Sequence, residues 1–442
     1  MMKQTGLLVL FAFWFCCLSG MENRGKLDAL YRKLGIPARM QTPDFWIASL
    51  SAPDAVIMDK ETIARFNEQN ITKSASMADI FQLPPTLDAE ELSRRIQNIS
   101  QVPTSLRFYA PKKSITPQQY QQLMQNTDLE NLPETTTVRY GLVTRRSYFR
   151  TFPSELAALR KGGKFDYFLE TAIYFCEPLA LLHLSKDGKW YFAQSYNYQG
   201  WVPVAHVAVG SKAAVEKYAS SPRYRIVTTS RYYLTIDDAL IQADMGTKIP
   251  CDTSDKFTEY LMVPLRSNTG ELTIRRLSVP KTPDLARDYL PYTRGNIIRQ
   301  GFRFAGEIYG WGGMHNTRDC SGFIMDIYRS MGVLLPRNAA QQAYCASGVF
   351  YPMASSLNAA ERVTLLSALP GPMPVYLDGH TMLYLGMVNG TPYILHDFVS
   401  FKLTPKSATT NAEITAVTPL TILRNTGKSY LLELYGARDF RY

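Results

Sequence analysis

The pattern of apolar and polar positions predicts a helical first part of the chain. Apolar residues recur at helical spacing between residues 22 and 130, and the segments 59–67 and 88–96 each begin with acidic residues that suit a helix start. Residues 126–137 are polar and contain Pro133, which marks a boundary. We therefore predict a mainly helical N-terminal unit that ends near residue 132.

The middle of the chain changes to the pattern of short strands. Residues 138–210 alternate apolar and polar positions, with turn signals at 186–188 and 197–200. A second strand-rich piece covers residues 224–279 and has a turn signal at 268–270. Short strands joined by such turns are typical of small β-barrels, so we predict two of them in succession.

The last third of the chain mixes the two patterns and predicts an α+β unit. Helical spacing covers residues 296–308, and a second helix is predicted after Asp319, with Gly332 placed to end it. Asn389-Gly390 is a hairpin signal between two later strands. The predicted strands are residues 375–377, 382–388 and 393–398.

The N-terminus resembles a secretory signal peptide. Lys3 precedes an apolar run at 7–18, and the small residues Ser19 and Gly20 follow. The run is shorter than a membrane span of about twenty residues, although an uncleaved anchor is the alternative. Because Phe15 precedes Cys16, where a lipidation motif has a small residue, we expect no lipid anchor. We expect export to the cell envelope, in the periplasm or outside the cell.

Composition excludes several classes of protein. Of the 442 residues 46% are hydrophobic and 19% charged, which excludes wholesale disorder. The net charge of +10 is spread over short basic pairs without a basic block, so we expect no nucleic-acid partner. Four cysteines remain after the signal, none in a CxxC pair, and the chain has five histidines. We therefore expect neither a disulfide framework nor a metal, and no cofactor.

Cys320 is the candidate nucleophile. A Gly-rich approach precedes it, and the Asp319 carboxylate can cap the helix that begins at Cys320. At a helix N-terminus the peptide dipoles favour the thiolate, while the charge of Asp319 opposes it. A positive partner is therefore needed, and an imidazolium is the usual one. The alternative is that Cys320 is a small buried hydrophobic residue.

Two histidines on the predicted hairpin are the candidate partners. His380 opens the strand 382–388, and His396 lies on the strand after the turn. A two-residue turn would pair His396 with Leu383, which places the histidines at one end of the hairpin but on opposite faces. A bulge or bend at the start of the strand is therefore required to bring them together. A cysteine, a histidine base and an orienting group form the site of a thiol hydrolase.

The C-terminal motifs resemble those of NlpC/p60 cysteine peptidases. The resemblance covers about 150 residues and implies a circularly rearranged papain-like α+β domain that acts on bacterial cell-wall peptides. It implies Cys320 as nucleophile, His380 as general base, His396 as the orienting residue and Tyr309 as the tyrosine near the nucleophile. The matching motifs are residues 309–313, 319–323, 335–337 with Gln341 or Gln342, and Gly379-His380 with Leu385-Gly386.

The upstream part adds to this resemblance. Residues 138–209 and 224–279 resemble bacterial SH3-like domains, and 43–100 resemble an N-terminal stabilising segment. The layout is similar to murein-peptide endopeptidases that cut between γ-D-glutamate and a diamino acid. It implies a free N-terminal L-Ala bound by Asp319, Ser321 and Tyr198, with Tyr196 as an alternative to Tyr198.

The expected organisation is multidomain. An α+β papain-like catalytic domain follows two β-barrel SH3-like domains and a mainly helical N-terminal segment. We expect a monomeric, exported cysteine endopeptidase for murein (peptidoglycan) stem peptides. The alternatives are an inactive cell-wall-binding protein, or an amidase or acyl transferase that uses the same Cys-His pair. The expected segments are a signal peptide (1–20), a stabilising domain (21–132), SH3-like domains (133–215 and 216–285) and a catalytic domain (286–442).

Overall fold

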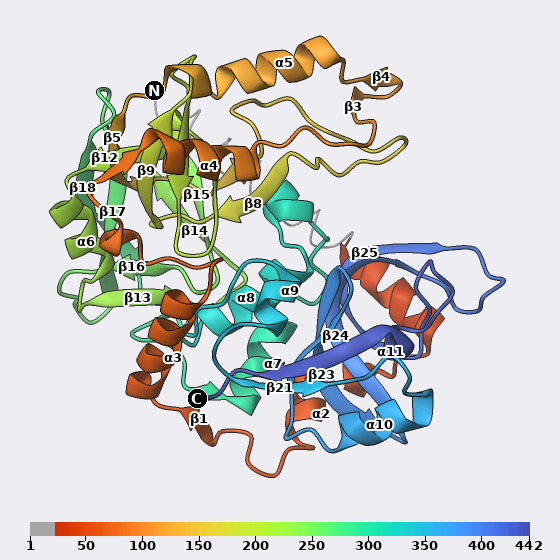
Figure 1. The fold of residues 1–442 in the computed structure, drawn as a ribbon. Coiled ribbons are helices and arrows are strands. Elements are labelled where there is room, and N and C mark those ends of the chain that lie inside the picture. The colour runs from red at the N-terminus through yellow and green to blue at the C-terminus, as the bar shows by residue number, and fades with distance from the viewer. Residues whose placement is uncertain (1–22) are drawn as a thin grey trace, which may run out of the picture.

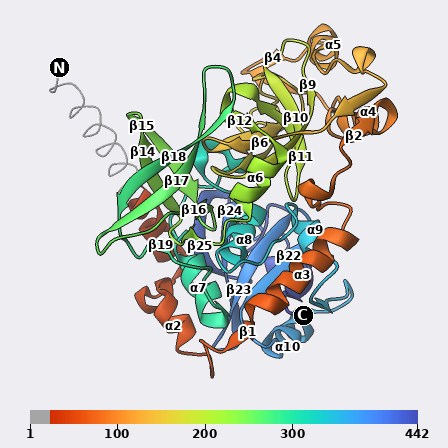
Figure 2. The ribbon, with the colours of Figure 1, turned by 90° about the vertical axis from the view of Figure 1, so that its left-hand side faces the viewer.

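The computed structural model describes residues 23–442, so the predicted signal peptide lies outside the described residues. Strand-rich units occupy one side of the molecule and the C-terminal α+β unit the other, with α8 (Cys320–Arg329) between them (Figures 1 and 2). No helix within residues 23–442 has the length and apolar character to cross a membrane.

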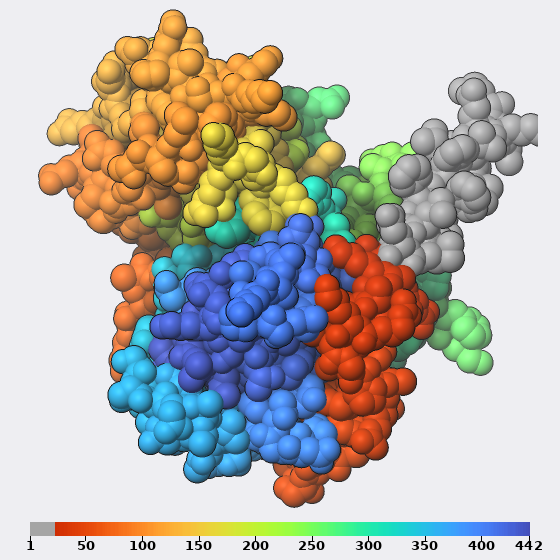
Figure 3. Space-filling model, turned by 90° about the vertical axis from the view of Figure 1, so that its right-hand side faces the viewer, coloured from red at the N-terminus to blue at the C-terminus, as the bar shows by residue number. Residues whose placement is uncertain are grey.

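The N-terminal segment lies along the other units and shares their cores. Trp46 and Phe66 pack into the core of the C-terminal unit, whereas Leu92 and Ile96 pack into that of the strand-rich units. Figure 3 shows its first residues, in red, against the side of the C-terminal unit. Its elements are η1 (Ala38–Gln41), α2 (Pro43–Ile47), β1 (Val56–Met58), α3 (Lys60–Lys73), η2 (Ile80–Gln82), β2 (Thr86–Asp88), α4 (Ala89–Ile99), β3 (Phe108–Ala110), β4 (Lys113–Ser114), α5 (Pro117–Asn126), η3 (Leu129–Asn131) and β5 (Thr135–Thr137).

Both helices predicted from acidic start signals are confirmed. The Asp59 side chain caps α3 by accepting a hydrogen bond from the backbone N–H of Thr62. Asp88 caps α4 in the same way. A carboxylate at this position satisfies one of the N–H groups that a helix leaves without a partner, which is why the local sequence predicts these two starts.

The first strand-rich unit is a seven-stranded antiparallel sheet in the order β12-β6-β9-β10-β11-β7-β8. The turn predicted at 186–188 joins β9 to β10. The turn predicted at 197–200 is displaced, because Gln199 and Gly200 already pair with β10 as part of β11. The elements are β6 (Arg139–Val143), β7 (Ser147–Arg150), β8 (Leu169–Ile173), β9 (Pro178–Leu184), β10 (Trp190–Gln194), β11 (Gln199–Pro203), η4 (Val204–His206), β12 (Val207–Gly210) and α6 (Lys212–Ala219).

The second strand-rich unit consists of a three-stranded sheet, β16-β13-β19, and two hairpins. The predicted turn at 268–270 joins β17 to β18. This unit shares one hydrophobic core with the first, in which Trp201 and Val227 are both fully buried. Cys176 and Cys251 are free thiols, hydrogen bonded by Tyr218 and Arg225 respectively. The strands are β13 (Tyr224–Val227), β14 (Arg231–Ile236), β15 (Ala239–Asp244), β16 (Lys248–Pro250), β17 (Thr258–Arg266), β18 (Leu272–Pro280) and β19 (Leu285–Ala286).

The C-terminal unit is a six-stranded sheet in the order β21-β26-β22-β23-β24-β25, packed against α7 and α8. The predicted strands and the Asn389-Gly390 hairpin are confirmed as β22, β23 and β24. The elements are β20 (Tyr292–Thr293), α7 (Arg294–Phe302), η5 (Trp311–Asn316), α8 (Cys320–Arg329), α9 (Ala339–Ala343), β21 (Val349–Pro352), α10 (Ala359–Ser367), β22 (Met373–Leu377), β23 (His380–Val388), β24 (Thr391–Phe401), β25 (Thr410–Pro419), α11 (Tyr430–Glu433) and β26 (Leu434–Asp439).

The two helices predicted in this unit have different outcomes. The helix expected over 296–308 is wrong at its end, because α7 stops at Phe302. The chain then turns, and Gly306 and Glu307 exchange backbone hydrogen bonds with Thr415 of β25. The helix after Asp319 is confirmed as α8, and Gly332 follows its end with φ +82°, a conformation that glycine adopts without strain.

Candidate active site

Cys320 is the first residue of α8 and its side chain is buried. The Asp319 carboxylate caps the helix through the N–H of Gly322 at 2.9 Å, as the sequence predicts. Burial raises the pKa of the Cys320 thiol to about 12, and the charge of Asp319 adds to this, whereas a backbone hydrogen bond from Thr381 opposes it. The resting sulfur is therefore a thiol, because desolvation outweighs the helix dipole that favours the thiolate.

The two histidines form a hydrogen-bonded chain in the sheet. His380 Nε2 lies 3.1 Å from His396 Nδ1, and His396 Nε2 lies 3.0 Å from the hydroxyl of Thr418. Burial lowers the pKa of His380 to about 3 and holds that of His396 well below its ordinary value. Both rings are therefore neutral at rest, and the hydrogen bonds fix their orientation.

A β-bulge brings the two histidines together. The strands pair Leu383 with Leu395, one residue short of His396, because Leu385 is an extra residue in β23. One step further along the ladder, Met382 lies opposite His396. Because Met382 and His380 are two residues apart on one strand, both histidines lie on the same face of the sheet. The bulge required by the sequence is confirmed, although it lies in the middle of the strand and not at its start.

Cys320 lies against the start of β23, where His380 is placed. Its sulfur is hydrogen bonded by Thr381, the residue after His380, and the described residues contain no direct hydrogen bond between that sulfur and the His380 ring. Tyr430 flanks His380 at 5.9 Å between ring centroids. Tyr309 is buried beside the nucleophile; burial, and then the nearby Cys320, raise the pKa of its hydroxyl well above the ordinary value. The four predicted residues of the catalytic group thus come from adjacent segments.

Asp319 has no acceptor position left for a ligand. Its Oδ1 accepts from Gly322 and, at 3.3 Å, from the hydroxyl of Ser321. Its Oδ2 accepts from the backbone N–H of Gly312 at 3.1 Å and from Arg337 at 2.6 Å. Although burial opposes ionisation, the Arg337 guanidinium holds the pKa of Asp319 below its ordinary value. Since a carboxylate has about four lone-pair positions, all of them are filled.

Arg337 connects Asp319 and Ser321, the residues on either side of the nucleophile, to the first strand-rich unit by hydrogen bonds. Its Nη1 donates to Ser321 Oγ at 2.7 Å, and its Nε donates to Thr171 Oγ1 of β8 at 2.5 Å. The guanidinium is buried together with its Asp319 partner. Asp319 and Ser321 thus lie together, but the cation that they bind is the guanidinium of Arg337 and not the ammonium group of a substrate.

Glu170 is a functional candidate that the sequence analysis missed. This β8 residue accepts hydrogen bonds from Tyr198 at 2.6 Å and from Thr151 at 2.5 Å, and it has no cationic partner among the described residues. The raised pKa of Tyr198 has burial and Glu170 as its main causes, and Arg337 and Asp319 also act on it, so Tyr198 lies beside the catalytic group. No sequence motif predicts a role for Glu170, because it comes close to the catalytic group only when the first strand-rich unit packs against the C-terminal unit.

Tyr196, the alternative to Tyr198, lies elsewhere. Its hydroxyl is buried without a hydrogen-bond partner, and the charges that act on it are chiefly those of Arg329 and Glu177. Tyr198 is therefore the better placed of the two tyrosines. Residues 23–442 contain no group of three or more His, Cys, Asp or Glu side chains arranged to hold a metal ion.

We expect alkylation of Cys320 by iodoacetamide at pH 7.5 to be at least about a hundredfold slower than that of a free cysteine. The thiolate is the reactive species, and a pKa near 12 leaves very little of it at that pH. Peptide mass spectrometry at several pH values measures the rate, which should rise steeply above pH 9. A rate that is already maximal at pH 7 would instead indicate a resting thiolate-imidazolium pair.

Comparison with known proteins identifies two domains. Residues 306–409 match the NlpC/P60 family, and residues 156–203 match the SH3 domain of the SH3b1 type. The chain resembles the gamma-D-glutamyl-L-lysine dipeptidyl-peptidase of Bacillus cereus (strain ATCC 10987 / NRS 248), with 26% identity over 33% of this chain and 43% of that protein. The protein of the same name from Bacillus subtilis (strain 168) is 41% identical over 13% of this chain and 20% of its own length.

These matches span less than half the length of either relative. Among solved structures, an NlpC/P60 endopeptidase from Photobacterium damselae subsp. piscicida superposes with a TM-score of 0.70 at 21% identity, covering 88% of this chain and 95% of that one. That likeness shows a shared multidomain fold. It extends beyond the two matched domains to most of the described chain.

Proposed function

We propose that this chain, which carries an NlpC/P60 domain behind an SH3 domain, is a cysteine endopeptidase. Its substrate would be a peptidoglycan peptide with a free N-terminal L-Ala, cut at the γ-D-glutamyl-diamino acid bond. The observation that carries the proposal is the placement of Cys320, at the start of α8, against the strand that begins with His380. The names of the two curated relatives support the substrate class.

In the proposed mechanism the Cys320 sulfur attacks the γ-carbonyl carbon while its proton moves to His380. His396, held by Thr418, orients the base and stabilises the imidazolium that forms. The backbone N–H of Cys320 and the Tyr309 hydroxyl stabilise the oxyanion. His380 then protonates the leaving amine, and afterwards takes a proton from the water that hydrolyses the thioester.

The same proposal places the substrate's ammonium group at Glu170. Asp319 is saturated by its own partners, whereas the Glu170 carboxylate is held by two hydroxyl groups and retains acceptor capacity. Tyr198 positions this carboxylate beside the catalytic group. Asp319 and Ser321, expected from the resemblance to bind the amine, then act with Arg337 to position the nucleophile.

We also propose that the chain works in the cell envelope. The signal-peptide pattern of the sequence and the SH3 domain of the SH3b1 type support this location. Detection of a shortened mature N-terminus in an envelope fraction would test it. A full-length chain confined to the cytosol would contradict it.

The central experiment is product analysis by mass spectrometry with L-Ala-γ-D-Glu-diamino acid peptides. We expect release of the dipeptide L-Ala-γ-D-Glu, and cleavage of the N-acetylated peptide slower by about a hundredfold or more, because the half-buried Glu170 carboxylate is left without its cation. Equal cleavage of both peptides would contradict the ammonium site. Binding without turnover would favour the inactive wall-binding alternative, and a different amide product would favour an amidase or transferase.

A variant tests the assignment of Glu170 directly. Glu170→Gln should raise KM for the free peptide by about tenfold or more and should reduce the discrimination against the acetylated peptide, because the carboxylate charge is lost. Glu130→Gln, which alters an exposed glutamate away from the site, is the control. If Glu170→Gln discriminates between the free and the acetylated peptide as strongly as the wild type, a residue other than Glu170 binds the ammonium group.

A further inference from the structure

A cavity of about 500 Å³ lies where the two strand-rich units meet the C-terminal unit. The turn between β6 and β7, the β14–β15 hairpin and the end of η5 each supply one wall, and Figure 2 labels the hairpin. We call it the arginine pocket. None of its lining residues belongs to the proposed catalytic group or to the proposed ammonium site.

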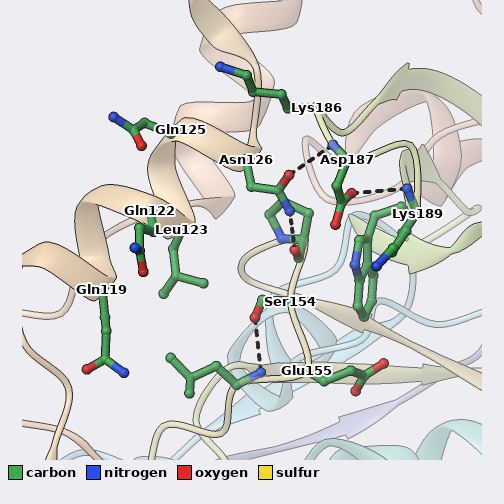
Figure 4. A pocket seen from close by; sticks show the side chains of 13 residues that line it. Gln119, Gln122, Leu123, Gln125, Asn126, Ser154, Glu155, Lys186, Asp187 and Lys189 are labelled. Carbon is green, nitrogen blue, oxygen red and sulfur yellow. Dashed lines mark hydrogen bonds between the residues drawn. The ribbon is translucent and has the colours of Figure 1, made fainter.

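The lining of the arginine pocket carries positive charge and no carboxylate. Its basic residues are Arg145, Arg146, Arg231 and His315. In contrast, the cavity beside α5 in Figure 4 is lined by Lys186 and Lys189 but also by Glu155 and Asp187. A concave surface that bears one sign of charge concentrates ions of the opposite sign. The arginine pocket therefore favours an anion.

Several donors of the arginine pocket are not used by the protein. The side chains of Arg145 and His315 form no hydrogen bond or ion pair with any other part of residues 23–442. Arg231 donates from Nε and Nη2 to Glu307 Oε2, at 3.1 and 2.7 Å, and its Nη1 has no partner in the same part of the chain. These three side chains therefore retain donors for a ligand.

Other residues of the arginine pocket join its walls. Arg146 donates to the backbone carbonyls of Gly313 at 3.0 Å and Thr317 at 2.7 Å, which connects the β6–β7 turn to η5 and its end. Gln242 of the hairpin donates to the carbonyl of Asn316 at 3.1 Å. These bonds form without a ligand, so a ligand would enter a preformed site and bind at a lower cost in ordering.

One face of the hairpin leads from charged to apolar surface. The strands pair Tyr233 with Gln242 and Thr235 with Leu240, so these side chains share a face with Arg231. Tyr233 is 38% exposed and Leu240 is 57% exposed. A ligand whose charged group meets Arg231 would cover both apolar side chains with the rest of its body and remove their surface from water.

We propose that the arginine pocket binds an amphiphilic organic anion. Its phosphate or carboxylate lies among Arg145, Arg231 and His315, because a guanidinium pairs with either group through a fork of two hydrogen bonds. Its aromatic or aliphatic body covers Tyr233 and Leu240. Each of the three units contributes to the site, so a bound anion stabilises their association. This binding is separate from peptide cleavage and does not rest on the proposed function.

The experiment is isothermal titration of the full chain with phenyl phosphate and with inorganic phosphate. We expect saturable binding of phenyl phosphate, about tenfold tighter than that of inorganic phosphate because the ring covers apolar surface. Arg145→Gln should weaken phenyl phosphate about tenfold, since a charged hydrogen bond is lost. The melting temperature should rise with phenyl phosphate in the wild type and less in the variant. Benzoate, titrated in the same way, distinguishes a carboxylate ligand from a phosphate.

Arg287→Gln is the matched control, because it removes an exposed arginine outside the arginine pocket. Leu240→Ser should reduce the preference for phenyl phosphate over inorganic phosphate and leave the affinity for inorganic phosphate unchanged. Equal affinities of Arg145→Gln and Arg287→Gln for phenyl phosphate, or no saturable binding by the wild type, would overturn the proposal. Peptide cleavage by Arg145→Gln at the wild-type rate would show that its weaker binding is not a general loss of structure.

Discussion

Replacing His380 by alanine is expected to lower kcat/KM for the tripeptide by about 10³- to 10⁴-fold. The Cys320 thiol is neutral in the resting site, so attack requires a group that takes its proton. His380 opens the strand whose next residue is hydrogen bonded to that sulfur, and its ring is neutral and therefore able to accept a proton. Initial rates by chromatography measure the loss.

Two further variants place this result in context. His396→Ala should reduce kcat less than His380→Ala, because it removes the group that orients the base and not the base itself. His183→Ala is the control, because His183 is hydrogen bonded to Thr127 and belongs to neither the catalytic group nor its hydrogen-bonded chain; it should leave kcat unchanged. Melting temperatures of all three variants separate catalytic loss from unfolding. A folded His380→Ala enzyme with more than a tenth of wild-type activity would exclude His380 as the base.

The parts of the site that could be predicted are those that local sequence determines. Asp319 caps α8 because a carboxylate before a helix accepts its first N–H groups, and this placed Cys320 at the helix start. The hairpin at Asn389-Gly390 set the two histidines at one end of two strands. The need for a bulge followed from the two-residue period of a strand, although its position depends on packing that no local pattern records.

The parts that could not be predicted depend on contacts between distant segments. The end of α7 is decided by Thr415, more than a hundred residues away, which pairs with the segment that helical spacing assigned to the helix. Glu170 has no motif and acquires its place only when β8 packs beside Arg337. The saturation of Asp319 is likewise set by Arg337, which the resemblance named only as part of a motif.

The largest expected effect on stability concerns Arg318, the residue before the helix cap. Its side chain is 1% exposed and forms ion pairs with Asp326 at 2.5 Å, Glu307 at 2.7 Å and Asp244 at 2.9 Å. Asp244 belongs to β15, so this arginine also joins the second strand-rich unit to α8. Arg318→Met would leave three buried carboxylates short of a cation, and we expect unfolding to require about 3–5 kcal/mol less free energy.

The pH dependence separates this electrostatic loss from a loss of packing. Burial raises the folded-state pKa of Asp326 from 3.8 to about 6, while Arg318 opposes the rise. A carboxyl whose pKa is raised by folding contributes stability below pH 3.8, and that contribution is lost as pH rises through the folded pKa. Removing Arg318 raises this pKa further, so the variant should lose more stability at pH 8 than at pH 5. Urea unfolding at both pH values, with a variant of the exposed Arg287, Arg287→Met, as control, measures the difference. An equal loss of stability at both pH values would mean that packing of the Arg318 side chain, and not its charge, explains the loss.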